Sequence, residues 1–225
     1  MIPALPLPVE IPATLAALDY AGVAVFAATG ALAAARRRQD LVTFGFFAAV
    51  TGVGGGTLRD LLIGAPVFWV QDWRYIAVSI AAAVIVWFTG RKQWGWRLRA
   101  LLWLDAFGLA AYGVMGAAKA EAFGAPPLIC IVMGALTACF GGVVRDLLAG
   151  EPSILLQREI TVSAALLAAT VFVVATHFGV PTAVAAAIAG LLGFGLRAGS
   201  LRFGWTLPSF PGRPGEPPGG ASSAS

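Results

Sequence analysis

Two arginine–aspartate pairs lie inside long apolar stretches of this 225-residue chain, one at Arg59 and Asp60 and the other at Arg145 and Asp146. An ionised side chain within a lipid bilayer is costly. Such residues therefore pair with an opposite charge, face a water-filled cavity or mark the path of an ion. The chemistry that these residue types indicate is the attraction and passage of small ions.

Two more aspartates, Asp19 and Asp105, also lie in apolar stretches. Their depths place Asp19 with Arg59 at one end of the membrane layer and Asp105 with Arg145 at the other, so we expect each arginine to pair with the aspartate at its own depth. Each end then has one arginine flanked by two aspartates, and the second aspartate of each group is available to attract cations at a pore mouth. Snorkelling or a purely structural ion pair is the alternative for these residues.

The charged pairs belong to an internal repeat with an offset of 86 residues, the distance from Arg59 to Arg145. Residues 51–66 align with residues 137–152 without a gap. Each copy covers three apolar segments, an odd number, so the second copy should cross the membrane in the opposite sense to the first. This predicts an inverted repeat, an arrangement that places a permeation or substrate site near the interface of the two copies.

Glycines precede both charged pairs: Gly54, Gly55 and Gly56 in the first copy, and Gly141 and Gly142 in the second. Each glycine inside a helix costs about 0.5–1 kcal/mol relative to alanine. Close packing of helices through small residues is one explanation. A cluster at the same depth in both copies predicts instead that each helix is kinked beside a water-filled cavity.

Three further side chains are candidates to line that cavity. Thr51 and Thr137 occupy equivalent positions in the two copies and offer hydroxyl ligands to a cation, although each could instead bond back to its own preceding turn. Tyr112 is the repeat equivalent of Phe26 and carries a hydroxyl group near the middle of the membrane. Ordinary core packing is the alternative for both aromatic residues.

The composition requires these side chains to lie in a membrane protein. Hydrophobic residues make up 59% of the chain and charged residues 12%, and the mean hydropathy is +0.84; a soluble domain has about twice that share of charge. Most of the seven apolar segments are close to the ~20 residues that span a bilayer as a helix. We therefore predict an all-α membrane protein with seven transmembrane helices, a 3+3 inverted repeat plus one extra helix. The segments are residues 12–35, 41–64, 75–90, 99–118, 127–149, 160–178 and 180–196.

The same segments define the expected organisation of the chain. Residues 12–90 form the first repeat, residues 99–178 the second and residues 180–198 the extra helix. Residues 207–225 are rich in proline, glycine and serine, which predicts a disordered tail.

Basic residues in the predicted loops are distributed unevenly between the two faces of the membrane. One face carries only Arg74 and Lys119, and the other carries eleven basic residues. The positive-inside rule makes the second face cytoplasmic, which places the N-terminus outside and the C-terminus inside. The eleven are Arg36, Arg37, Arg38, Arg91, Lys92, Arg97, Arg99, Arg158, Arg197, Arg202 and Arg213.

Several classes of function lack support in the sequence. The one histidine, His177, excludes a multi-histidine metal site, and Cys130 and Cys139 lie in one apolar stretch as small packing residues. No nucleophile and base recur in a catalytic pattern, and no basic stripe is interleaved with aromatic residues. We therefore expect no enzyme activity, no cofactor, no bound structural metal and no nucleic-acid partner.

Three motifs together resemble those of a known family, the prokaryotic branch of the trimeric intracellular cation channels. They are the small residues followed by arginines at 29–38, the Gly-Gly-Gly-x-x-Arg-Asp core at 54–60 and the Pro-Val-Phe-Trp at 66–69. The resemblance covers about residues 15–200 and implies a homotrimer with a potassium-permeable pore in each protomer. It also implies that the glycine motifs kink the second and fifth helices around that pore. The second copy departs from the motif, with Phe140 where the first copy has Gly54.

The resemblance implies further properties. K⁺ or Na⁺ would be the permeant ion, membrane lipids would surround the trimer with room for a bound lipid, and the protein would be a multi-pass protein of the inner (plasma) membrane. Similar sequences are also labelled glycine transporters, so a secondary transporter of glycine or another small amino acid is the alternative. A channel needs a continuous wet path, whereas a carrier needs an occluded site. A purely structural protein would leave the buried charges without a role.

Overall fold

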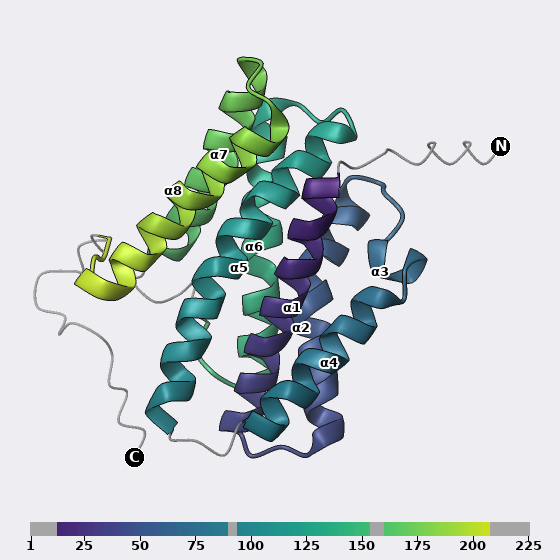
Figure 1. The fold of residues 1–225 in the computed structure, drawn as a ribbon, viewed down its shortest axis with the longest axis vertical. Helices are drawn as coiled ribbons and strands as arrows, with labels where there is room; N and C mark the ends of the chain where they lie inside the picture. Colours follow the sequence, from purple (N-terminus) through teal and green to yellow (C-terminus); the bar gives the residue numbers. More distant parts are fainter. Residues whose placement is uncertain (1–12, 90–93, 154–159, 208–225) are drawn as a thin grey trace, which may run out of the picture.

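The computed structural model describes residues 13–89, 94–153 and 160–207, and within these ranges it describes side chains for residues 17–89, 99–153 and 160–207. The described residues contain eight helices (Figure 1). Of the predicted disordered tail, only Leu207 is among them. The helices are α1 (Ala13–Arg36), α2 (Leu41–Leu62), α3 (Phe68–Gln71), α4 (Arg74–Thr89), α5 (Trp94–Ala122), α6 (Pro127–Ala149), α7 (Thr161–His177) and α8 (Thr182–Phe203).

Each of the seven predicted apolar segments lies on one of these helices, and the short helix α3 is an additional element. Five helices are long and apolar enough to cross a membrane, namely α1, α2, α5, α6 and α8, while α4 and α7 are shorter apolar helices. The predicted all-α membrane class is therefore confirmed by the structure.

The long helices lie roughly side by side (Figure 1). Helix α1 packs against α2, α4 and α5, and α6 packs against α2, α5 and α7. Helices α7 and α8 form an antiparallel pair that leans on α5. We call the end where α1, α4, α6 and α8 finish the lower end, and the end where α2, α5 and α7 finish the upper end, as they appear in Figure 1.

Local sequence signals explain where the central helices begin and end. Asp40 caps α2, since its Oδ1 accepts a hydrogen bond of 2.8 Å from the backbone N of Thr43. Helix α6 begins at Pro127, where the missing N–H costs nothing. It ends at Ala149 and is capped by Gly150, whose φ of 61° is the left-handed conformation that glycine adopts most readily.

The glycines of the two motifs allow α2 and α6 to cross with their backbones in contact. A Cβ atom on Gly55 would collide with the carbonyl oxygen of Thr137, and a Cβ on Gly141 would lie 2.8 Å from the carbonyl oxygen of Thr51. The two contacts are equivalent in the repeat, because the offset of 86 relates Gly55 to Gly141 and Thr51 to Thr137. Helical structure continues through the glycines in both α2 and α6, so close packing accounts for these two positions.

A second exchanged pair of contacts joins α1 to α5. A Cβ on Gly22 would collide with the ring of Tyr112, and a Cβ on Gly108 would lie 3.0 Å from the ring of Phe26. The two rings stack with their centroids 5.2 Å apart. Glycine at both positions therefore makes room for an aromatic stack in the core between α1 and α5.

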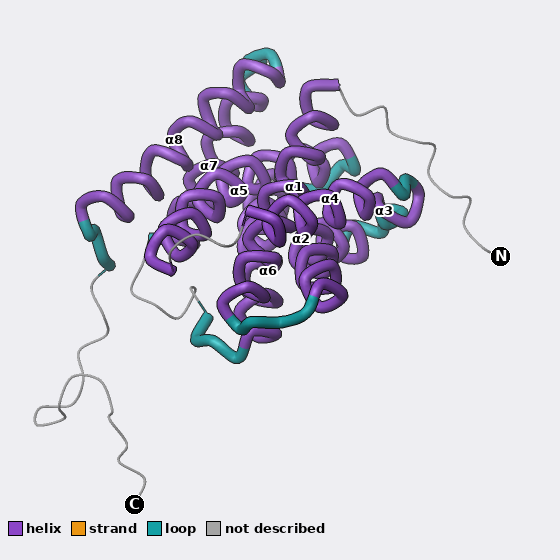
Figure 2. The backbone as a smooth tube through the Cα atoms, turned by 60° about the horizontal axis from the view of Figure 1, so that its bottom comes forward, coloured by secondary structure: helices purple, strands orange, loops and turns teal. Residues whose placement is uncertain are grey.

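The lower end is held together by charges on the loops. The Nη1 of Arg36 lies 3.0 Å from Oε2 of Glu151, and Nη2 of Arg37 donates a 3.0 Å hydrogen bond to the carbonyl oxygen of Gly150. These contacts tie the α1–α2 loop to the segment that follows α6, and Figure 2 shows this end brought forward.

Candidate functional site

A buried group of four charged side chains lies at the upper end, and we call it the upper cluster: Asp19 of α1, Arg59 and Asp60 of α2, and Lys119 of α5. None is more than 6% exposed. Asp60 Oδ1 is 2.8 Å from the Nε of Arg59 and 2.8 Å from the Nζ of Lys119. The Nη1 of Arg59 is 3.9 Å from Oδ1 of Asp19, the pairing that their common depth predicts.

Helix α3 covers the upper cluster. The backbone N of Phe68 donates a 2.9 Å hydrogen bond to Oδ2 of Asp60. The ring of Phe68 has the Arg59 guanidinium carbon 5.6 Å and the Lys119 Nζ 5.7 Å from its centroid, distances at which a cation is attracted to the ring face. Gly56 lies directly against this ring, where a Cβ would approach to 2.5 Å.

A tyrosine pair connects the upper cluster to the surface. The hydroxyl of Tyr75 donates to Oδ2 of Asp19 at 3.3 Å, and the rings of Tyr75 and Tyr20 stack with centroids 4.1 Å apart. The Tyr20 hydroxyl donates to Oδ2 of Asp72 at 2.5 Å. This hydrogen bond, more than any other influence, lowers the pKa of the Asp72 carboxyl below its ordinary value.

The upper cluster differs from the expected one in two respects. Lys119 was predicted in a loop, and this is wrong, because α5 continues to Ala122, one turn past the predicted end at Ala118, and Lys119 points into the bundle. The cluster therefore contains two aspartates and two cations, so it is formally neutral and not net negative. Asp60 was expected to be the aspartate left to attract cations, but it already contacts both cations of the cluster.

A second group, the lower cluster, consists of Asp105 of α5 with Arg145 and Asp146 of α6. The Nη1 of Arg145 lies 2.6 Å from Oδ1 of Asp105. Its Nε and Nη2 each lie 2.9 Å from Oδ1 of Asp146. All three residues are at most 4% exposed. The predicted contact between Asp105 and Arg145 is present; the role of both clusters as pore mouths stays a prediction.

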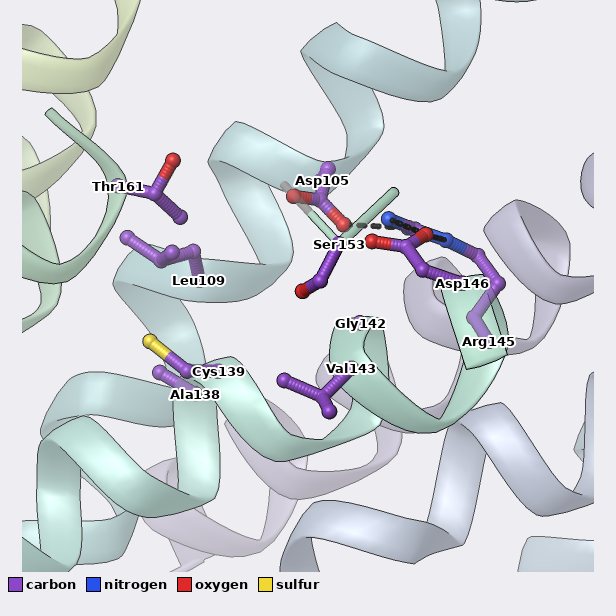
Figure 3. A pocket seen from close by; sticks show the side chains of 10 residues that line it. All are labelled: Asp105, Leu109, Ala138, Cys139, Gly142, Val143, Arg145, Asp146, Ser153 and Thr161. Atoms are coloured by element: carbon purple, nitrogen blue, oxygen red, sulfur yellow. Dashed lines mark hydrogen bonds and ion pairs between the residues drawn. The ribbon is translucent and has the colours of Figure 1, made fainter. Parts of the chain in front are cut away.

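A cavity of about 10 Å³ lies beside the lower cluster, between α5, α6 and the start of α7 (Figure 3). This is room for about one water molecule. Its lining combines the three charged side chains with Cys139, Ser153 and Thr161 and several small or apolar residues. The Thr161 hydroxyl is buried and has no hydrogen-bond partner among the described residues. The cavity is therefore polar enough to hold water or a small cation.

The remaining glycines of the motifs have different surroundings. Gly142 lines the cavity, and a Cβ there would lie 3.6 Å from Nη2 of Arg145 and 3.8 Å from Oδ1 of Asp105. Gly54 has open space around its Cβ position. Its repeat equivalent is the bulky Phe140, so the two copies are not alike at this point.

The hydroxyl candidates are also not equivalent. Thr137 donates to the carbonyl oxygen of Met133 at 2.6 Å, which is the bond back to the preceding turn that was its alternative. Thr51 is fully buried, and its hydroxyl has no hydrogen-bond partner among the described residues. The Tyr112 hydroxyl donates to the carbonyl oxygen of Gly52 at 3.1 Å. Thr51 is thus the candidate whose oxygen remains available to a ligand.

Arg197 is a buried charge that the sequence reasoning misplaced. The sequence predicts it on the basic membrane face, because the last apolar segment ends at residue 196. Helix α8 instead continues to Phe203, and Arg197 is 0% exposed within it. When the buried residues Arg197 and Lys119 are left out of the count, ten basic residues remain on the predicted cytoplasmic face and one on the opposite face. Position next to an apolar segment does not distinguish these two residues, since Arg36 also directly follows one and is only half-buried.

The arrangement as a whole is one charged cluster at each end of a helical bundle, joined through the crossing of α2 and α6. Charged residues at membrane depth that face the inside of a bundle mark pathways for ions or substrates. The described residues contain no group of three or more histidine, cysteine or acidic side chains that could hold a metal ion. Fold and site together define a polytopic helical membrane protein of the channel and transporter class.

Comparison with known proteins narrows this class. The sequence model of one family, described as Glycine transporter, matches residues 16–91 and again residues 102–177. The structure of a trimeric intracellular cation channel orthologue from Rhodobacter sphaeroides is similar, with a TM-score of 0.82 and 45% identity, covering 85% of this chain and 98% of that one. The inner membrane protein YadS of Escherichia coli is 35% identical over 195 residues, 86% of this chain and 94% of YadS. A membrane protein of Vibrio cholerae is 34% identical over 196 residues, 86% of this chain and 81% of that protein.

The chain therefore belongs to the prokaryotic branch of the trimeric intracellular cation channel family, to which the Glycine transporter sequence model also corresponds. The two matched ranges of that model are separated by 102 − 16 = 86 residues, the offset of the internal repeat.

Proposed function

We propose that this protein is a monovalent-cation channel, permeable to potassium, with a pore in each protomer. The observation that carries the proposal is the pair of buried aspartate-containing clusters at opposite ends of one bundle. The lower cluster has two aspartates and one arginine, and its net negative charge favours cations over anions. The likeness to the Rhodobacter sphaeroides protein, whose name identifies it as a cation channel, supports the same function.

The proposed pore runs from the upper cluster past the crossing of α2 and α6 to the lower cavity. In this path an ion would pass Phe68 at the upper end and the stacked rings of Phe26 and Tyr112 near the centre. Thr51 offers an oxygen beside Gly30, about one turn of α1 beyond Phe26. Because each of these side chains is buried, conduction requires the ring of Phe68 and the central stack to move aside. The glycine motifs of α2 and α6 supply the bend that such a movement needs.

We further propose that the fold is a 3+3 inverted repeat with a seventh transmembrane helix, α8, and that α4 and α7 also cross the membrane. The exchanged contacts support this, because the offset of 86 converts the contact between Gly55 and Thr137 into that between Gly141 and Thr51. The ten-to-one distribution of basic residues supports an outside N-terminus and a cytoplasmic C-terminus. A phosphatase fused to the C-terminus should then be inactive, and an active fusion would contradict the orientation.

The assembly that we propose is a homotrimer surrounded by lipids in the inner membrane. The words trimeric and inner membrane come from the names of the Rhodobacter sphaeroides and Escherichia coli relatives. Cross-linking of purified protein in lipid nanodiscs should give a ladder that ends at three protomers.

The deciding experiment is single-channel recording of the purified protein in planar bilayers, with glycine uptake into proteoliposomes as the contrast. A channel gives unitary currents whose reversal potential follows the potassium gradient. Saturable glycine uptake without unitary currents would support the transporter instead. The Asp146→Asn variant should conduct with a reversal potential shifted toward that of chloride; an unchanged reversal potential would remove Asp146 from the pore.

A further inference from the structure

Three arginines are the largest fully buried side chains of the described structure: Arg59, Arg145 and Arg197. The first two belong to the repeated charged pairs. Arg197 lies on α8, outside both copies of the repeat, and so has no repeat equivalent. A guanidinium at membrane depth is too costly to be incidental, so Arg197 needs an explanation of its own.

The packing of α8 places Arg197 behind the lower cavity. A Cβ on Gly193, one turn before Arg197, would lie 2.7 Å from the Cβ of Ala168 and 3.2 Å from the carbonyl oxygen of Ala164, so α8 and α7 are in close contact there. Because the two helices are antiparallel, Arg197 lies at the level of Thr161, the first residue of α7. Thr161 lines the cavity.

The thiol of Cys139 lies within electrostatic range of Arg197. This thiol lines the cavity from α6 (Figure 3). Arg197 and Asp105 both act on it electrostatically, and with opposite sign. Helix α8 packs against α5 and α7, so the guanidinium acts from the side of the cavity opposite to α6.

Among the buried charged side chains of the described residues, the two ends of the protein then have the same formal charge balance. The upper cluster has two aspartates, Arg59 and Lys119, and the lower end has two aspartates, Arg145 and Arg197. At the upper end the second cation, Lys119, comes from α5, a helix of the second copy. At the lower end α5 contributes Asp105, and the second cation comes from the appended helix.

We propose that Arg197 is a specificity-determining residue of the lower cavity, which uses its positive charge to limit how strongly the cavity holds a cation. A permeant ion must be attracted strongly enough to enter and weakly enough to leave. The lower cluster alone has a formal charge of −1, and Arg197 offsets it from behind without blocking the cavity. This inference rests on the proposed function for its meaning in conduction, but the effect on the cavity can be measured without conduction.

Cys139 provides the measurement, because its thiol reacts with Ag⁺, a monovalent cation, and with the neutral reagent methyl methanethiosulfonate. The experiment compares the two reaction rates at Cys139 in full-length protein that carries Cys130→Ala, so that one thiol remains. The ratio of the Ag⁺ rate to the neutral rate reports cation attraction, because a change in thiol reactivity or access affects both reagents.

We expect Arg197→Gln to raise this ratio about tenfold, as for a unit charge about 10 Å away at an effective dielectric constant of about 20. Arg197→Lys should keep the wild-type ratio. Arg197→Met, which removes the charge and keeps the length of the side chain, should behave like Arg197→Gln and replaces it if that variant does not fold. An unchanged ratio in a folded, uncharged variant would overturn the inference.

Recordings in bilayers separate this inference from the proposed function. If the wild type conducts, each cation should stay longer in the lower cavity of Arg197→Gln. The variant should then have a lower saturating conductance and reach half of it at a lower potassium concentration. A wild type that does not conduct, together with a raised Ag⁺ ratio, would refute the channel and leave the role of Arg197 at the cavity intact. Conduction with identical saturation curves for both proteins would refute the role of Arg197.

Discussion

Replacing Asp60 by asparagine should destabilise the protein more than the same change at Asp19. Asp60 accepts contacts of 2.8 Å from Arg59 and 2.8 Å from Lys119, as well as the hydrogen bond from the backbone N of Phe68. Asp19 has one ion pair at 3.9 Å and a hydrogen bond from Tyr75. Asparagine preserves the size of the side chain and one acceptor, so the change removes mainly the charge.

The expected difference follows from these distances. With an effective dielectric constant of about 20, two contacts of 2.8 Å amount to about 12 kcal/mol of attraction and one of 3.9 Å to about 4 kcal/mol. Much of this lost attraction is offset in the asparagine variants, because the energetic cost of burying a carboxylate is removed at the same time. Breaking a buried pair costs about 3–5 kcal/mol in practice. We expect a loss in that range for Asp60→Asn and about a third of it for Asp19→Asn.

The assay is the free energy of unfolding in mixed micelles, measured by titration with a denaturing detergent and followed by circular dichroism. A double-mutant cycle with Lys119→Met tests the cause. Once Asp60 is neutral, Lys119 is a buried cation beside Arg59, so adding Lys119→Met should recover at least about 1.5 kcal/mol. Equal losses for Asp60→Asn and Asp19→Asn, or additive losses for Asp60→Asn and Lys119→Met, would refute the reasoning.

Three further predictions follow from single contacts. Gly55→Ala should cost about 1–3 kcal/mol because its Cβ meets the Thr137 carbonyl oxygen, whereas the control Gly54→Ala, in open space, should be neutral or slightly stabilising; equal effects in the same unfolding titration would contradict the packing of α2 on α6. Tyr112→Phe should cost about 1 kcal/mol through loss of the hydrogen bond to Gly52, and unchanged stability would show that this bond is not formed. The Tyr20 hydroxyl lowers the pKa of Asp72, so their hydrogen bond stabilises the fold fully above the ordinary carboxyl pKa and this stabilisation is lost as the pH falls through the lowered pKa. The difference in melting temperature between wild type and Tyr20→Phe should therefore be constant from about pH 8 to about pH 5 and shrink below about pH 4. A difference that grows on acidification would contradict this sign.

Hydropathy and charge placement were sufficient to predict the class of fold and the depth of most of the charged residues. Apolar segments of nearly the right length mark helices because a bilayer leaves the backbone no other partners. The depth of Asp105 and Arg145 along their helices indicated their contact for the same reason, since a buried charge must be neutralised at its own level. The repeat was also readable, because the offset needs no gap.

Tertiary structure decided which side chains share a cluster. Lys119 and Arg197 lie in helices whose ends extend beyond the apolar segments, so hydropathy placed them in loops, whereas the packing of α5 and α8 turns both side chains inward. The hydrogen bond from the Phe68 backbone to Asp60 depends on α3 returning over the end of α2, which no local pattern encodes. The glycines show the same division. Their positions are visible in the sequence, but only the crossing of α2 and α6 shows that Gly55 meets a neighbouring backbone while Gly54 meets nothing, because the contact depends on which helix faces are opposed.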